Sequence, residues 1–339
     1  MNERYMFSGE AESFEKLELT KEEEAILKGL GLAPEDLHKL LATHPFAEGS
    51  YALLFELPNN GDSNLVAKAW KNRKRDSERG AVENVALRLL RIRNFKNAQR
   101  VSGYLRPSSI LFEEKVEGEP VEQLTKDCIE RLALALADLH SIKLNAYGKP
   151  LTKRKEGTQM DCLLDGIETL HKVAEPFASQ AEVMELVNKA LYKIKNKAEK
   201  SSVAFSSTNF TLVHFDLNKN NILYSKKDGA PIIIDWEQAS AGDGAMDIAK
   251  LFLKSGFDAD QKSDFLKTYE SHQVDDQSHF QERLKAYEPF VLINSIIWRL
   301  GVLRDMPQQM TSDNESQFYN RVKTNFDKEI KTLKDFVLE

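Results

Sequence analysis

The sequence has few cysteines and lacks the segments that direct a chain to a membrane. Only Cys128 and Cys162 are present among the 339 residues, and neither has the spacing of a metal ligand, which favours reduced thiols over a disulfide framework or zinc site. No apolar run reaches bilayer-spanning length, and the first residues contain no signal-peptide core or lipidation motif. We therefore expect a cytoplasmic protein that does not contact a membrane.

An excess of positive charge is also missing. The net charge of -6 at pH 7 argues against a general nucleic-acid binder and mildly favours a cationic substrate. The length, with 41% hydrophobic residues, is sufficient for one large or two modest domains with a real core. The oligomeric state is left open by the sequence.

The P-loop motif G-x-x-x-x-G-K-[ST] is absent as well, which excludes one common solution to nucleotide binding. What the sequence does contain is a polar constellation within Thr211–Glu237. Two short apolar runs flank a loop that holds Asp216 and Asn221, a turn follows at Asp228-Gly229, and a buried-type strand ends at Asp235. Phosphoryl transfer needs little more than a carboxylate for the attacking hydroxyl and hard oxygen ligands for magnesium.

The spacing of these residues carries a family resemblance. The pattern H-x-D-x-x-x-x-N at His214, Asp216 and Asn221, followed by I-D-W-E ending at Glu237, resembles the aminoglycoside phosphotransferase and choline kinase superfamily. Members of that superfamily are small-molecule kinases with a protein-kinase-like fold, whereas protein kinases have D-F-G in place of D-W-E. Phe215 stands where the family usually has glycine, so we expect the loop to differ on its substrate side.

The resemblance implies roles for the residues of this stretch. Asp216 would be the catalytic base, Asn221 and Asp235 would hold Mg2+, and His214 would hold the loop. The segment G-D-G-A-M-D-I-A, similar to the family's G-D-P-x-x-D-L-A, would let Asp247 brace the catalytic loop through hydrogen bonds. A single aspartate in a loop is more often a cap or turn residue, so the prediction rests on the joint pattern.

A lysine inside an apolar strand marks the other half of the predicted site. Lys68 lies in the strand 65–70, where a charge is costly unless it is paired, placed at a ligand, or extended to water. The resemblance implies that it contacts the nucleotide phosphates and that Glu83 positions it, with Glu78 as the competing glutamate. The preceding turn at Gly49 and Ser50 would cover the phosphates, although a plain hairpin turn is its default interpretation.

After a loop predicted over 94–106, the strand 110–116 precedes the expected hinge. The resemblance implies that backbone groups of Glu114 and Val116 pair with the adenine edge. Phe112 would line the adenine pocket or fill the core.

We predict an α+β, two-lobed, protein-kinase-like fold with a small antiparallel-sheet N-lobe and a larger, mostly helical C-lobe. An N-terminal arm with helices would occupy 1–44, the nucleotide-binding N-lobe 45–116, and the catalytic and substrate-binding C-lobe 117–339, with a helical insertion at about 145–210. Further helices are predicted near 259–272, 279–303 and 313–337. Tyr287, Trp298 and Arg299 are candidates for the acceptor pocket, or else for the core.

The predicted function is transfer of the γ-phosphate of ATP, or of GTP, to a hydroxyl of a small molecule with Mg2+. An aminoglycoside-like amino sugar is the first candidate acceptor because the family prototype uses one and the chain is acidic. Choline, ethanolamine, another sugar or a nucleoside are alternatives. A protein-serine kinase or a catalytically silent scaffold are the competing functions, and the joint presence of Lys68, Asp216, Asn221 and Asp235 disfavours the scaffold.

Overall fold

The computed structural model describes residues 17–49, 51–57, 64–121, 123–149, 151–273, 279–306 and 313–339. Ser50, residues 1–16 of the predicted N-terminal arm and the turn predicted at 58–62 therefore lie outside the described residues. Among the helices of the described segments, none is both long enough and apolar enough to span a bilayer.

The N-lobe is built on one antiparallel sheet. Its strands lie in the order β1 (Ala47–Glu48), β2 (Ala52–Glu56), β3 (Leu65–Trp70), β5 (Ile110–Glu114) and β4 (Val101–Leu105). The prediction of a loop over 94–106 is wrong at β4. Ser102 and Gly103 interrupt the apolar pattern there, and the pairing is irregular between Val101 and Gly103, so the strand signal is weak in the sequence.

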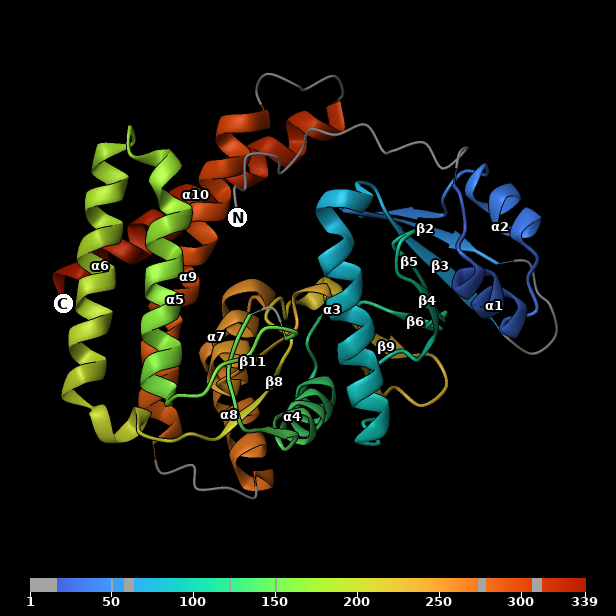
Figure 1. Ribbon diagram of the computed structural model, residues 1–339. Coiled ribbons are helices and arrows are strands. Elements are labelled where there is room, and N and C mark those ends of the chain that lie inside the picture. Colours follow the sequence, from blue (N-terminus) through green and yellow to red (C-terminus); the bar gives the residue numbers. More distant parts are fainter. Residues whose placement is uncertain are drawn as a thin grey trace.

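Two helices cover one face of this sheet, as Figure 1 shows at the right of the molecule. Helix α1 (Lys21–Gly29) begins with the predicted capping box of Thr20 and Glu23, and α2 (Pro34–Leu41) has proline in its first turn. Their leucines, including Leu27 and Leu37, share a buried cluster with Phe55 of β2. Residues 17–41 are thus packed as part of the N-lobe.

Helix α3 (Arg73–Ile92) lies on the opposite side of the sheet (Figure 1). Because side chains alternate along a strand, Lys68 and its cross-strand partner Leu111 point to the α3 side, whereas Ala67, Ala69 and Phe112 point to the α1 side. Phe112 therefore fills the outer core and does not face the same side as Lys68.

The C-lobe is mostly helical. Its helices are α4 (Lys126–His140), α5 (Gln159–Ala174), α6 (Ala181–Lys200), α7 (Gly244–Ser255), α8 (Ala259–His272), α9 (Phe280–Asp305) and α10 (Asp313–Leu338). The predicted insertion corresponds to α5 and α6, which pack beside α9 and α10 at the left of Figure 1. The three helices predicted after residue 258 are confirmed within one or two residues at each end.

Two small sheets carry the loops of interest. One is β10 (Pro231–Ile233), β9 (Ile222–Ser225) and β6 (Gly118–Glu119), and the other is β11 (Ser240–Gly242), β8 (Phe210–Val213) and β7 (Lys143–Leu144). The loop from β8 to β9 contains Asp216 and Asn221, and β10 ends just before Asp235. These sheets therefore bring the polar residues of one stretch to one edge of the C-lobe.

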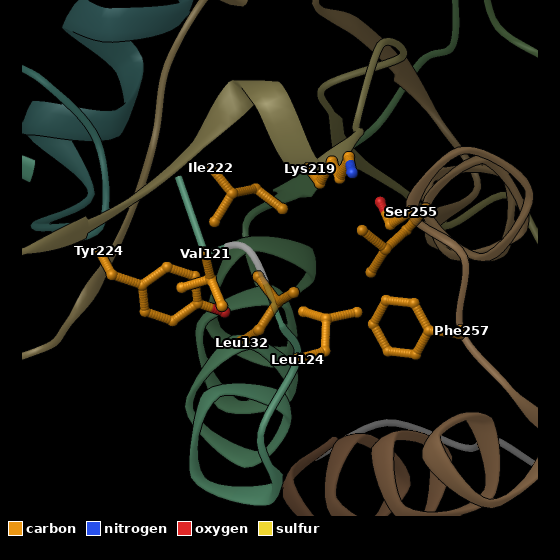
Figure 2. A pocket seen from close by; sticks show the side chains of 9 residues that line it. Val121, Leu124, Leu132, Lys219, Ile222, Tyr224, Ser255 and Phe257 are labelled. Atoms are coloured by element: carbon orange, nitrogen blue, oxygen red, sulfur yellow. The ribbon is translucent and has the colours of Figure 1, made fainter. Parts of the chain in front are cut away.

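An apolar hollow lies between the 121–124 segment and the end of α7. Figure 2 shows Lys219 facing a group of apolar side chains that includes Val121, Leu124 and Phe257. Its volume of about 10 Å³ has room for about one water molecule. None of the predicted site residues lines it, so we do not associate it with the chemistry.

Candidate active site

A buried lysine joins the two lobes. The Nζ atom of Lys68 lies 2.7 Å from Glu83 Oε2 on α3 and 2.6 Å from Asp235 Oδ1 after β10. Lys68 is 6% exposed and Glu83 is fully buried, so the amine is held by carboxylates and does not extend into water. Glu78, the competing glutamate, instead pairs with Lys153 at 2.5 Å.

The charges of this group control each other's protonation. Burial alone would lower the pKa of Lys68, but Asp235 and Glu83 outweigh it and hold that pKa well above its ordinary value. Burial likewise opposes ionisation of Asp235, yet the Lys68 ammonium keeps the pKa of Asp235 below its ordinary value. Lys68 and Asp235 are therefore both charged at neutral pH.

Glu237 is a member of this group to which the sequence assigned no role. It accepts hydrogen bonds from Trp70 Nε1 at 3.2 Å and from Arg79 at 3.0 Å, while the Trp236 N–H donates to Glu83 Oε1 at 3.0 Å. β3 and α3 of the N-lobe are thus tied to the D-W-E segment. The glutamate of the D-W-E motif was the sequence feature that could have indicated this role. Its partners could not be inferred, because they come from elements more than 150 residues away.

Three carboxylates here come close enough to share a cation: one oxygen each of Glu83, Asp235 and Glu237 lies within 4.8 Å of the others. Glu83 and Glu237 are already occupied by the bonds above, whereas Asp235 uses Oδ1 for Lys68 and its side chain is 38% exposed. Asn221 donates through Nδ2 to Asp216, and within the described residues its Oδ1 makes no hydrogen bond. A carboxylate and an amide oxygen of this kind fit the preference of Mg2+ for hard oxygen ligands.

The backbone of the loop around Asp216 is hydrogen-bonded to the side chain of Asp247. Its two oxygens accept the N–H groups of His214 at 2.7 Å and Phe215 at 2.8 Å, and it also faces His140 at 3.4 Å. Burial opposes ionisation of Asp247, but His140 outweighs it and lowers its pKa. The structure thus places Asp247 where a brace for the loop was expected.

His214 stabilises the same loop from within. One ring nitrogen, Nδ1, lies 3.2 Å from the Asp216 N–H, and the other, Nε2, lies 2.8 Å from the Ile234 carbonyl. The ring also packs against Trp236, with centroids 4.7 Å apart. These contacts link the Asp216 loop to the strand that presents Asp235.

Phe215, which stands where the resembling family usually has glycine, adopts a backbone conformation that glycine favours. Its φ of 66° lies in the left-handed region, which costs a residue with a side chain about 1–2 kcal/mol relative to glycine. The ring is half-buried and has the Lys149 amine 3.5 Å from its centroid. The bulky residue therefore keeps the glycine-like backbone and adds an aromatic surface next to Asp216.

The side chain of Asp216 faces a lysine that the sequence analysis did not single out. Lys250 on α7 places Nζ 3.3 Å from Asp216 Oδ1, and Asp216 remains 42% exposed. Lys250 is three residues after Asp247 and therefore shares its helix face. Tyr287 is buried in the core, and Arg299 pairs with Glu329 of α10.

The hinge and turn residues are placed mainly by backbone bonds. The Gly49 N–H closes its turn on the Ala52 carbonyl at 2.9 Å, and the Glu114 N–H donates to Arg100 at 2.8 Å. Val116 is half-buried in the segment between the lobes. Beside them, Glu113 is buried on the Lys68 side of the sheet, and that burial raises its pKa.

A model of the phosphotransferase enzyme family matches residues 86–282, which is more than half of the chain. The chain belongs to this family. The matched region includes the Asp216 loop, Asp235 and Asp247, whereas Lys68 and Glu83 precede it. This phosphotransferase has no match among curated proteins.

Solved structures of small-molecule kinases share the fold of this phosphotransferase. A choline kinase, LicA from Streptococcus pneumoniae, has 18% identity and a TM-score of 0.56, covering 84% of this chain and 93% of its own. An ethanolamine kinase from Plasmodium vivax has 15% identity and a TM-score of 0.60, covering 94% and 92%. The ADP-bound aminoglycoside phosphotransferase APH(2'')-Ib has 17% identity and a TM-score of 0.53, covering 87% and 97%.

At such identities the likeness is one of fold. It confirms the predicted two-lobed, protein-kinase-like α+β architecture. Together with the family match, it confirms the resemblance found in the sequence and makes this protein a phosphotransferase with a kinase-like fold.

Proposed function

We propose that the protein transfers the γ-phosphate of ATP to a hydroxyl of a small molecule, with Mg2+ as the metal. The observation that carries this proposal is the Lys68 ammonium held at 2.7 Å from Glu83 and 2.6 Å from Asp235, with the Asp216 loop braced on the same edge of the C-lobe. This arrangement keeps a fixed cation and metal-ligand oxygens beside a carboxylate that faces solvent.

In the proposed reaction, the acceptor oxygen forms a bond to the γ-phosphorus while the bond from that phosphorus to the β–γ bridging oxygen breaks. Asp216 orients the hydroxyl and takes its proton, and ADP leaves. Lys68, positioned by Glu83, contacts the phosphates, and Asn221 and Asp235 would hold Mg2+, which neutralises phosphate charge when bound. His214 and Asp247 hold the loop, and backbone groups near Gly49, Glu114 and Val116 contact the nucleotide.

The acceptor predicted first from the sequence was an amino sugar, with choline, ethanolamine, another sugar or a nucleoside as alternatives. Amino sugars, choline and ethanolamine are cationic, and the lysine 3.3 Å from Asp216 disfavours a cation at that position. GTP stays an alternative donor.

The direct test is Asp235→Ala. The variant should lose magnesium-dependent nucleotide binding, measured by calorimetry with ATP in the presence and absence of Mg2+. Unchanged binding with Mg2+ would contradict the assignment of Asp235 as a metal ligand. Failure of the unmodified protein to bind any nucleotide would contradict the proposed function as a whole and favour a silent scaffold.

A further inference from the structure

The charges beside Asp216 bear on the acceptor. Helix α7 carries Lys250 and Lys254 four residues apart, so both lie on one helix face about 5–6 Å apart. Lys250 Nζ lies 3.3 Å from Asp216 Oδ1, and its side chain is 15% exposed. One turn further on, Lys254 contacts the Ser295 hydroxyl of α9. The two amines therefore extend from the Asp216 loop into the space next to α9 and α10.

The carboxylate nearest to Lys254 is already shared. Glu329 of α10 accepts two hydrogen bonds from Arg299 of α9, at 2.9 and 3.0 Å, and one from Ser295 at 2.8 Å. Lys254 Nζ lies 3.6 Å from the same carboxylate. One glutamate thus serves the buried Arg299 and the half-buried Lys254, which does not balance their charge.

The ion pairs of this group contain more positive than negative charge. Within the described part of the chain, Lys250, Lys254 and Arg299 pair with Asp216 and Glu329, which leaves a net charge of +1 in this set. Burial lowers the pKa of Lys254 to about 8; Glu329 opposes this shift, while Arg299 and Lys250 add to it. An added anion would remove the imbalance.

Lys250 also lies beside the aromatic ring next to Asp216, with its Nζ atom 5.7 Å from the centroid of the Phe215 ring. The charge of Lys250 next to the base is thus opposite to the net charge of the chain, which is -6. A local positive region attracts anionic ligands and disfavours polycations, whatever the net charge of the whole protein.

We propose that the acceptor is an anionic hydroxyl compound, with its hydroxyl at Asp216 and its carboxylate or phosphate group bound by Lys250 and Lys254. This inference rests on the proposed phosphotransferase function and adds the charge of the substrate. Because Lys250 lies 3.3 Å from Asp216 Oδ1 and Lys254 lies one turn further along α7, the hydroxyl and the anionic group would be separated along the direction of this helix. The ordinary alternative is that Lys250 only neutralises Asp216.

The test uses the full chain with Mg2+ and ATP, and measures ADP release with four related acceptors: glucosamine, glucose, gluconate and glucose 6-phosphate. A larger set of hydroxyl compounds, sorted into cationic, neutral and anionic members, is assayed in parallel. We expect turnover to concentrate among anionic members. Comparison of ADP release with gluconate and with glucose 6-phosphate shows whether the anionic group of the acceptor is a carboxylate or a phosphate.

Variants test whether Lys250 and Lys254 bind the anionic group of the acceptor. Lys250→Gln and Lys254→Gln should each raise the KM for the anionic acceptor about tenfold or more while the KM for ATP stays unchanged, since each loses a charged hydrogen-bond donor. Lys267→Gln, an exposed position on α8, makes the same change in net charge and should alter neither constant. Lys250→Arg, which keeps the charge, should recover most of the affinity.

Two outcomes would overturn the proposal. One is turnover concentrated among cationic acceptors, and the other is a Lys250→Gln variant that loses kcat while its acceptor KM stays the same. In either case the unmodified protein still consumes ATP, so the phosphotransferase function stands. Loss of nucleotide binding in the unmodified protein would instead contradict that function.

Discussion

The nucleotide side and the acceptor side of the proposed site differ in how their charges are arranged. On the nucleotide side, Lys68 is buried between Glu83 and Asp235, and Glu237 has its own donors. On the acceptor side, Lys250 and Lys254 share too few carboxylates, and Asp216 is partly exposed. In the first arrangement each carboxylate has a hydrogen-bond donor within the protein, which suits a constant substrate such as ATP. The second needs a ligand to balance it, so it is where we expect specificity to lie.

Removing the base should give the largest difference between the two sides. Asp216→Asn should lower kcat by roughly 10²–10⁴-fold because the hydroxyl loses its proton acceptor. The affinity for nucleotide, measured by calorimetry, should stay within about twofold, since Asp216 belongs to the acceptor side. Equal losses in kcat and in nucleotide affinity would mean that the two sides are not separate.

Breaking the buried ion pair should be the largest effect on stability. Lys68→Met leaves Glu83 buried without its counter-charge, which costs about 3–5 kcal/mol of unfolding free energy. Lys172→Met removes a lysine from an exposed pair with Glu168 on α5 and should cost less than about 1 kcal/mol. Urea unfolding compares them, and a similar loss in both variants would contradict the account of the nucleotide side.

The acceptor side should respond to pH. Because the pKa of Lys254 is about 8, its charge is lost as the pH rises through that value, and the KM for an anionic acceptor should rise up to about tenfold per pH unit above it. Lys254 is faced by Glu329, Arg299 and Ser295 from α9 and α10, and by Lys250 and Asp216 on its own side. Lys254→Arg stays charged and should remove this dependence.

The lowered pKa of Lys254 also affects the stability of the fold. Acceptor binding should weaken as the pH rises, whereas the free energy of unfolding should increase. The folded pKa of Lys254 lies below its unfolded value of about 10.4, so the unfolded chain binds more protons between those two values. This group should therefore increase the free energy of unfolding as the pH rises from 8 toward 10.4. The Lys254→Met variant, measured by urea unfolding over that range, should lack this contribution.

Phe215 should give the smallest effect. Phe215→Ala keeps the left-handed backbone but removes the ring that contacts Lys149, a cation–π contact of about 0.5–1 kcal/mol at an exposed position. The acceptor KM should change two- to fivefold, with the ATP KM unchanged. A change confined to the KM for ATP would mean that the ring acts on the nucleotide side, which would contradict this account.

Most of the nucleotide side could be predicted from the sequence. Short motifs carry Asn221 and Asp235, as they do Asp216 on the acceptor side, and a lysine in an apolar strand is conspicuous in itself. The structure brings Lys68 and Glu83 into contact as expected, and it adds a contact between Lys68 and Asp235 that was not predicted. The roles of these residues stay predictions. The capping box at Thr20 and the C-terminal helices were likewise readable from local patterns.

Apart from Asp216 and the candidate Arg299, the acceptor side could not be predicted because it is assembled from distant elements. Lys250 follows a motif residue by three positions, but only the packing of α7 against the loop places it at Asp216. Glu329 and Arg299 come from α9 and α10, where helical periodicity does not distinguish a charged network from an exposed face. β4 was missed for a similar reason, since Ser102 and Gly103 conceal a strand that pairing stabilises.

The most direct test of the central claim follows the γ-phosphate itself. The protein is incubated with Mg2+, γ-labelled ATP and the acceptor set, with Asp216→Asn as the blank, and the labelled products are separated. The account predicts a labelled phosphate ester of an anionic hydroxyl compound with the unmodified protein and almost none with the variant. Label transferred equally well by Asp216→Asn would contradict it.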